Sequence, residues 1–249
     1  MNANSKEDLQ ESQYHFPYHH LTHEHGGGFY LFRHLFWGLV HYTYIQFVIG
    51  EITKQSFQTI ADIGCGEGRI LTELSPKMPN TQLFGYDISE PALHFARGFT
   101  TRPTFSMQDI TVSPLETKVD AVVSCEVIEH IKPEHVDSYC KNIAASLHDG
   151  GVFFITTPTK NVPVNSKHYQ HFTRESLSEY LSPYFIIEDV AFLNHQNLFS
   201  KILDKIIANR FFLSNSPTLN GWVLKTYRKY LLLVKEDTGS RIYIKARKK

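Results

Sequence analysis

Two carboxylates and an imidazole lie within five residues near the middle of the chain. Glu126, Glu129 and His130 directly follow an apolar segment that ends at Cys125. Carboxylate and imidazole groups this close together suit either a divalent metal ion or acid/base chemistry. The spacing alone leaves both alternatives open.

A glycine turn occurs earlier, in the run Ile60–Arg69. Gly64, Gly66 and Gly68 follow an apolar segment and precede a predicted helix, and Asp62 lies two residues ahead of the first glycine. Glycines at such a turn let backbone N–H groups approach a ligand beside the start of a helix. The G-x-G-x-G spacing is tighter than the G-x-G-x-x-G of dinucleotide-binding turns.

Two further acids follow short apolar segments. Asp87 ends the segment 82–87, near the distance where a ribose-binding carboxylate belongs, and Asp109 follows the segment 104–108. Ligands of doubly wound sheets bind beyond the carboxyl ends of the strands. We therefore expect the glycine turn, these acids and the Glu126–His130 run to lie around one site.

Strand and helix patterns alternate along the central part of the chain, which predicts a mostly parallel sheet. Strands are expected near residues 59–63, 82–87, 104–108, 119–125, 151–156 and 184–193, and helices near 67–75, 90–98, 133–147 and 173–182. Pro133 suits a first helical turn, and Thr173 is a predicted N-cap. The turn Asp149–Gly151 is expected to open the fifth strand, and the alternating Arg241–Ala246 is expected to be a strand as well.

Residues 1–54 are expected to form an N-terminal segment rich in histidine and aromatic residues, ending in a helix at 30–54. The uncharged stretch 35–50 is too short and too polar for a membrane span, so we expect the helix to pack on the sheet or cover the ligand. The segment holds clustered histidines: His15, His19, His20, His23 and His25. No cysteine accompanies them, and the spacing fits no closed metal site; a loop over the active site is the preferred interpretation.

Net charge is zero over the 249 residues, but the charge is unevenly distributed. Residues 197–249 carry 12 Lys and Arg against 3 Asp and Glu. A basic segment of this kind can contact an anionic surface. Helical patterns broken at Pro217 predict a basic helical insertion at about 194–240, which is expected to be a substrate lid, a dimer surface or a membrane-facing hairpin.

Cysteine usage and the start of the chain bear on location. Cys65, Cys125 and Cys140 have no paired spacing, and residues 1–13 are polar with no secretory pattern. A reducing compartment fits both observations. We expect a cytoplasmic protein, with peripheral contact to a membrane as the alternative. The sequence does not indicate an oligomeric state.

The glycine turn and the acids together resemble the class I S-adenosylmethionine (SAM) methyltransferases, from about Thr59 to Leu193 and in the last strand. The resemblance implies a doubly wound, seven-stranded Rossmann-like α/β sheet with helices on both faces and an antiparallel last strand, carried by residues 55–249. It implies an enzyme that uses SAM, with the glycine loop at the amino-acid part, Asp87 at the ribose and Asp109 at the adenine. The full set of implied SAM contacts is Asp62, Gly64, Cys65, Gly66, Asp87, Ile88, Asp109, Ile110 and Glu126.

The run Glu126–His130 with the later run His168–Arg174 resembles two groups of that superfamily. One is the ubiquinone-pathway O-methyltransferases with their small-molecule relatives, and the other is the small-RNA 3′-terminal 2′-O-methyltransferases. In the RNA group these positions bind a metal, which implies Glu126, Glu129, His130 and His168 as ligands of Mg²⁺, Mn²⁺, Fe²⁺ or Zn²⁺. Without a metal, His130 or His168 becomes the candidate general base, and Glu129 is the third candidate catalytic residue.

The expected function is metal-assisted or base-assisted O-methylation of a small-molecule, glycan or lipid-linked acceptor. The alternatives are an RNA 2′-O-methyltransferase and a catalytically silent SAM-binding subunit. The chain lacks the Arg-His-x-Asp-His run of the RNA group and a separate RNA-binding domain, so a nucleic acid is the less favoured partner. It also departs from the ubiquinone-pathway group, because its insertion after the sixth strand is longer.

Overall fold

The computed structural model describes residue 6 and residues 23–25, 27–30, 35–209 and 212–249. The histidines His15, His19 and His20, and with them most of the predicted loop over the active site, lie outside the described residues. His23 and His25 belong to the short strand β1 (His23–His25), which pairs antiparallel with β2 (Gly28–Tyr30).

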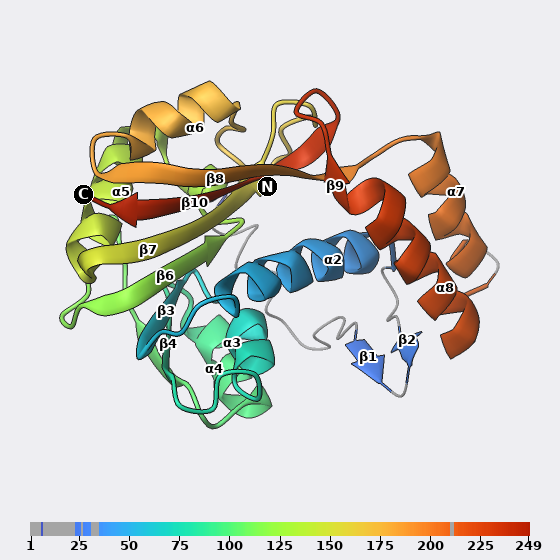
Figure 1. Ribbon diagram of the computed structural model, residues 1–249, viewed down its shortest axis with the longest axis horizontal. Coiled ribbons are helices and arrows are strands. Elements are labelled where there is room, and N and C mark those ends of the chain that lie inside the picture. Colours follow the sequence, from blue (N-terminus) through green and yellow to red (C-terminus); the bar gives the residue numbers. More distant parts are fainter. Residues whose placement is uncertain (1–5, 7–22, 26, 31–34, 210–211) are drawn as a thin grey trace, which may run out of the picture.

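An eight-stranded mixed sheet organises the molecule in the order β5-β4-β3-β6-β7-β10-β8-β9 (Figure 1). The strands are β3 (Thr59–Ile63), β4 (Gln82–Asp87), β5 (Thr104–Met107), β6 (Val119–Cys125), β7 (Leu147–Pro158), β8 (Phe185–His195), β9 (Leu233–Val234) and β10 (Gly239–Lys248). The four pairings from β5 to β7 are parallel, and β10 runs antiparallel between β7 and β8. The predicted Rossmann-like sheet and its antiparallel last strand are confirmed.

The strand count differs from the predicted seven because β9 adds an edge strand. Leu233 and Val234 pair with Leu193 and Phe192 of β8. A two-residue strand has no alternation of apolar and polar positions, so no pattern in the sequence could indicate it.

The turn at Asp149–Gly151 lies inside β7 and does not precede it. Val119 of β6 pairs with Leu147, whereas Ala121 pairs with Val152, so the intervening residues bulge out of the register. Gly150 has φ +73°, which a glycine adopts without strain. The helix predicted at 133–147 is shorter at both ends. Pro133–His135 forms a 3₁₀ turn, and α5 follows it as Val136–Ser146.

Two apolar clusters cover the two faces of the sheet. Successive strand residues alternate between them: Ile60 belongs to the cluster that includes α3 (Arg69–Leu74) and α4 (Glu90–Phe99), and Ala61 to the cluster that includes α5 and α6 (Arg174–Leu181). This alternation is the period-two pattern of a strand buried on both sides. The predicted N-cap Thr173 is confirmed, because its hydroxyl accepts a hydrogen bond from the Ser176 N–H.

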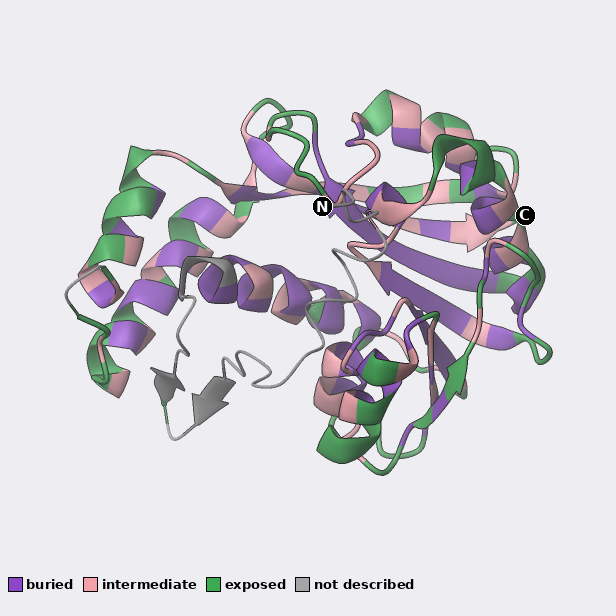
Figure 2. Ribbon diagram, turned by 180° about the vertical axis from the view of Figure 1, so that it is seen from behind, coloured by how far each residue is buried: buried purple, intermediate pink, exposed green. Residues whose placement is uncertain are grey.

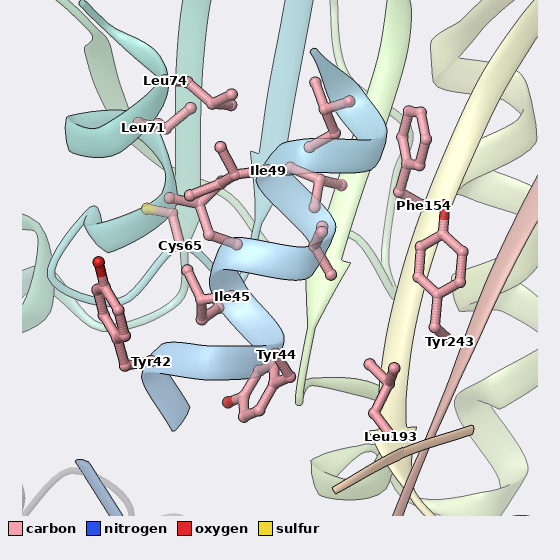
Figure 3. Close-up of a cluster of buried hydrophobic side chains, with 14 of the residues drawn as sticks. Tyr42, Tyr44, Ile45, Ile49, Cys65, Leu71, Leu74, Phe154, Leu193 and Tyr243 are labelled. Atoms are coloured by element: carbon pink, nitrogen blue, oxygen red, sulfur yellow. The ribbon is translucent and has the colours of Figure 1, made fainter. Parts of the chain in front are cut away.

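The helix α2 (Leu35–Ile52) packs against the sheet next to α3. Tyr44, Ile49 and Ile52 are almost fully buried, and Figure 3 shows side chains of this helix between Leu71 of α3 and Phe154 of β7. A helix that is apolar on most sides is buried in this way. None of the helices in the described ranges is long and apolar enough to cross a membrane.

Two further helices follow β8 and precede β10 in the sequence. They extend beyond the end of the sheet (Figure 1). They are α7 (Leu198–Ile207) and α8 (Pro217–Tyr227), and α8 continues as a π turn at Arg228–Leu232. Asn197 caps α7 and Ser216 caps α8, with Pro217 at the first helical position. Residues 215–217, where the sequence pattern predicts a break, lead from the segment between the two helices into α8.

Candidate functional site

The glycine turn between β3 and α3 makes a backbone cradle. Gly64 N–H and Cys65 N–H both donate to the carbonyl oxygen of Tyr86, at 2.7 and 3.0 Å. Gly64 has φ +70°, and a Cβ at this position would lie 2.4 Å from the Cγ2 of Val127. The turn thus needs a residue without a side chain, for both its backbone conformation and its space.

Asp87 lies at the carboxyl end of β4 and faces the turn. One carboxylate oxygen accepts from Gly66 N–H at 2.8 Å, and the other accepts from Ser89 N–H at 2.9 Å. A carboxylate has about four lone-pair sites, and Asp87 lines the cavity described below. The backbone donors orient the carboxylate before any ligand arrives.

Asp62 lies beneath the same turn and is almost fully buried. Its Oδ2 has no hydrogen-bond partner among the described residues. Burial, followed by the nearby charges of Asp87 and Glu67, raises the pKa of Asp62 well above its usual value. A buried carboxylate oxygen without a partner suits a ligand that brings a cationic donor, such as an ammonium group.

A cavity of about 470 Å³ extends from the turn across the ends of β4 and β5. Asp87, Ile88, Asp109 and Ile110 line it, as do Gly64 and Glu126. Asp109 is exposed and its Oδ1 accepts from the N–H and hydroxyl of Thr111, whereas Ile110 is buried. Asp87 suits the hydroxyls of a ribose, and the apolar side chains Ile88 and Ile110 beyond it suit a base. This part of the cavity therefore fits an adenosine group.

A second cavity of about 480 Å³ lies on the other side of the turn. It is lined by Asp62, Cys65 and Gly66 of the cradle, by Tyr44 of α2 and by His168 of the loop after β7. Four residues line both cavities: Gly64, Glu126, His130 and Lys167. The two cavities therefore meet where the glycine turn faces the end of β6.

Glu126 stands at this meeting point in a strained conformation. Its φ is +58°, a region that residues with a side chain seldom adopt. Its Oε2 accepts from Arg241 Nε at 2.9 Å, and its Oε1 accepts from the Thr156 hydroxyl at 3.3 Å. Backbone strain of this kind is found at functional sites, where the surroundings maintain it.

The structure brings together three of the four predicted metal ligands. Glu129, His130 and His168 each place one donor atom within 4.8 Å of the others. Glu126 is outside this group and pairs with Arg241 instead. The Glu129 Oε2 accepts from the Thr157 hydroxyl at 3.0 Å, and its Oε1 is buried with no partner among the described residues.

The hydrogen bonds of the two imidazoles fix which nitrogen carries a proton. A carbonyl oxygen only accepts, so His130 Nδ1–H donates to the Lys167 carbonyl at 3.1 Å. His171 Nδ1–H donates likewise to the Val162 carbonyl at 2.9 Å, which leaves its Nε2 to accept from His168 Nδ1–H at 2.7 Å. The lone pairs of His130 and His168 are then both on Nε2, and that of His168 accepts from the Asn165 side-chain N–H at 3.0 Å.

Both imidazoles are neutral at physiological pH. Burial lowers the pKa of His130 to about 4 and that of His168 to about 3. Burial, followed by the charge of Glu126, raises the pKa of Glu129 well above its usual value. Neutral imidazoles whose Nδ1–H is held by a second partner are the form in which histidine binds metals in proteins.

Sequence reasoning missed Arg241, Lys167 and His171. The sequence pattern places Arg241 only in an alternating strand. In the structure it is a largely buried cation that lines the second cavity, with its guanidinium 4.6 Å from the ring centre of Tyr44. Its position at the start of β10, which was predicted to join the sheet, was the available signal. His171, within the run His168–Arg174, is buried, and no pattern in the sequence shows its contact with His168.

Residues 61–153 match a family model described as a methyltransferase domain. Among curated proteins, trans-aconitate 2-methyltransferase of Afipia carboxidovorans is 28% identical over 113 residues, which is 45% of this chain and 43% of that protein. The chain spans less than half the length of the first curated relatives it matches.

Two solved structures share the fold. The N-methyltransferase NodS of Bradyrhizobium japonicum, in complex with S-adenosyl-L-homocysteine, has a TM-score of 0.57 at 12% identity, covering 84% of this chain and 85% of its own. The [4+2]-cyclase SpnF has a TM-score of 0.62 at 18% identity, covering 99% and 97%. At these identities the likeness establishes the fold alone, and one fold supports several reactions.

Proposed function

We propose that this chain, a member of the class I SAM-dependent methyltransferases, methylates an oxygen of a small-molecule acceptor. One observation carries the proposal: the cofactor-sized cavity and the second cavity meet at Glu126 and His130. Two ligands that fill such cavities have their reacting ends side by side, which is the positioning that a transfer reaction needs.

The first cavity and the cradle fit SAM. Asp87 would accept from the ribose hydroxyls, and Ile88, Asp109 and Ile110 would border the adenine. Asp62, whose Oδ2 lacks a partner, would face the amino group beside the glycine turn of Gly64, Cys65 and Gly66. When bound, SAM supplies a methyl group on a positively charged sulfur, which a nucleophile can accept.

The part of the second cavity beyond the cradle would hold the acceptor, beside His130 and His168. An imidazole whose pKa is about 3 is a weak base at neutral pH. The site therefore suits an acceptor oxygen that is already acidic, or one whose acidity a bound cation increases. The relative in Afipia carboxidovorans is named for an acid acceptor, which is consistent with this class.

Glu129, His130 and His168 would hold a divalent cation. The fit rests on one donor atom from each residue within 4.8 Å of the others and on the buried Glu129 Oε1 without a partner. At His168 Nε2 the ion would replace the amide of Asn165. Such an ion acts as a Lewis acid that orients an acceptor oxygen and lowers its pKa. Mixed imidazole and carboxylate ligands are compatible with Zn²⁺, Fe²⁺ and Mn²⁺.

Methyl transfer from radiolabelled SAM into fractionated host extract tests the proposal. Label in the small-molecule or lipid fraction is the expected result. Label in RNA alone would refute the acceptor class, and no label from protein that still binds SAM would support a silent subunit.

The cation has its own test, independent of turnover. Calorimetric titration with Zn²⁺ or Mn²⁺ should show one site in the wild type and a much weaker one in the Glu129→Gln variant. The matched control is Glu134→Gln, since Glu134 lies exposed in the neighbouring 3₁₀ turn. Equal affinity in all three proteins would remove Glu129 from the ligand set.

A further inference from the structure

The helices α7 and α8 each carry two apolar faces. The inner faces pack into the core through Leu203, Ile207, Val223 and Tyr227, all buried. The outer faces and the loop between the helices expose further large apolar side chains. This outer patch consists of Leu198, Phe199, Ile202, Phe212, Leu213, Leu219, Trp222 and Tyr230.

The outer patch is more exposed than folding requires. Leu198 is 74% exposed, Trp222 is 53% exposed and Phe212 is 51% exposed. Figure 2 shows exposed residues along the outer side of α7, at the end of the molecule away from the sheet. A helix that packs on a core needs only one apolar face, and large apolar side chains gathered on the exposed side of neighbouring elements mark an interaction site.

Basic side chains accompany the outer patch. Lys201 and Lys205 are exposed on α7, and Lys225 and Lys229 are exposed on α8 and its π turn. Lys201, Lys205 and Lys225 form no ion pair within the part of the chain that the structure describes. Residues 197–235 contain a single acid, Asp204, so the charge of this surface is positive.

The composition of the outer patch indicates what kind of partner it binds. Helices that lie in a membrane interface expose Leu and Ile beside Trp, Tyr and Phe, and they carry lysines as well. The outer patch and its helices have this composition. Lysine stems can follow apolar surface while the ammonium groups contact lipid phosphates. We propose that the outer patch of α7 and α8 binds the surface of an anionic lipid bilayer.

The position of α7 next to the second cavity would bring that cavity close to the bilayer surface. Gln196 lines that cavity, and the next residue, Asn197, caps α7. The exposed Leu198 and Phe199 therefore lie directly beyond the rim. If the proposed function holds, an acceptor that resides in the bilayer reaches the cavity without crossing water; this last step alone rests on that function.

Co-sedimentation of the full chain with lipid vesicles tests the proposal without SAM or acceptor. We expect binding to vesicles of phosphatidylcholine with phosphatidylglycerol, weakened by salt, and little binding to phosphatidylcholine alone. The Leu198→Ser/Ile202→Ser variant and the Lys201→Glu/Lys205→Glu variant should each bind about tenfold or more weakly. The control Ile186→Ser removes an apolar residue that is 56% exposed on β8 and should bind like the wild type.

Circular dichroism and SAM affinity establish that the variants are folded. Equal vesicle binding by the wild type and both patch variants, or no binding to anionic vesicles, would overturn the proposal. Sedimentation of the wild type as a dimer that the patch variants dissociate, without vesicle binding, would assign the patch to a second copy instead. Because no step measures methyl transfer, failure of the proposed function leaves each of these outcomes interpretable.

Discussion

Glu126 and Arg241 form an ion pair of 2.9 Å between residues that lie 115 positions apart. The carboxylate comes from the end of β6 and the guanidinium from β10, and the ring of Tyr44 from α2 covers the guanidinium. Both charged side chains are largely shielded, with 18% and 11% of their surfaces exposed. The pair thus joins three separate parts of the chain at the point where the two cavities meet.

Loss of the cation of this pair should destabilise the protein. Arg241→Gln leaves the Glu126 carboxylate shielded and unpaired, so we expect the free energy of unfolding to fall by about 2–3 kcal/mol. Glu126→Gln/Arg241→Gln should recover part of this loss, because neither buried charge remains. Urea unfolding of the wild type, the two single variants Glu126→Gln and Arg241→Gln, and the double variant measures the coupling energy. Strictly additive losses of unfolding free energy would contradict the pair's role.

Removal of the Asp87 carboxylate should weaken SAM binding by about 30-fold or more, because charge-assisted hydrogen bonds to two ligand hydroxyls contribute about 2 kcal/mol or more. Calorimetry with SAM provides the measurement. Asp87→Ala is compared with Asp109→Ala, whose carboxylate is exposed and bonds its own loop, so we expect a smaller loss for the latter. Unchanged affinity of Asp87→Ala would refute its assignment.

The parts of the site predicted from sequence are those that local patterns determine. The strand ends, the glycine turn and Asp87 follow from alternation, turn chemistry and spacing along the chain. The contacts of Glu126 with Arg241 and of His168 with His171 depend on how β10 and the loop after β7 pack, which one sequence does not encode locally. This is why Glu126 was grouped with the histidines, whereas the structure pairs it with a cation that was not considered.

Substitutions in the Glu129–His130–His168 group should separate binding from turnover. We expect Glu129→Gln and His168→Ala to keep SAM affinity within about threefold and to lower turnover by about 100-fold or more. His135→Ala is the control, because that histidine lies in the 3₁₀ turn at Pro133–His135 and does not line either cavity. Turnover retained by both site variants would exclude a catalytic or ligand role.

A methyl group on Gly64 should disrupt the cradle. In Gly64→Ala the new Cβ meets the Val127 side chain at 2.4 Å, and φ +70° strains any residue with a side chain. We expect a loss of about 2–4 kcal/mol in the free energy of unfolding. Adding Val127→Ala relieves the collision but not the strain, so thermal unfolding should show partial recovery; Gly98→Ala, where a Cβ meets nothing within 4 Å, is the control.

Asp204 should make stability depend on pH. Burial raises the pKa of this carboxyl to about 7, and its Oδ1 has no partner among the described residues. Between about pH 4 and pH 7 the folded protein keeps a proton that the unfolded chain releases, so the free energy of unfolding falls as pH rises through this window.

The variant Asp204→Asn removes this dependence. It should gain stability relative to the wild type between pH 4 and pH 8, by about 2 kcal/mol once partial exposure of the group is allowed for. Urea unfolding at both pH values measures the difference, with the exposed Asp237→Asn as control. A constant difference between Asp204→Asn and the wild type across this range would show that Asp204 ionises normally.

The position of β10 has a consequence for the order in which the molecule is assembled on the ribosome. This strand lies between β7 and β8, which do not pair with each other. A nascent chain that has emerged only as far as α8 therefore has no strand that pairs β8 with the main sheet, and its Glu126 has no Arg241. The Glu126–Arg241 pair and the closure of the sheet between β7 and β8 are thus acquired in the same event.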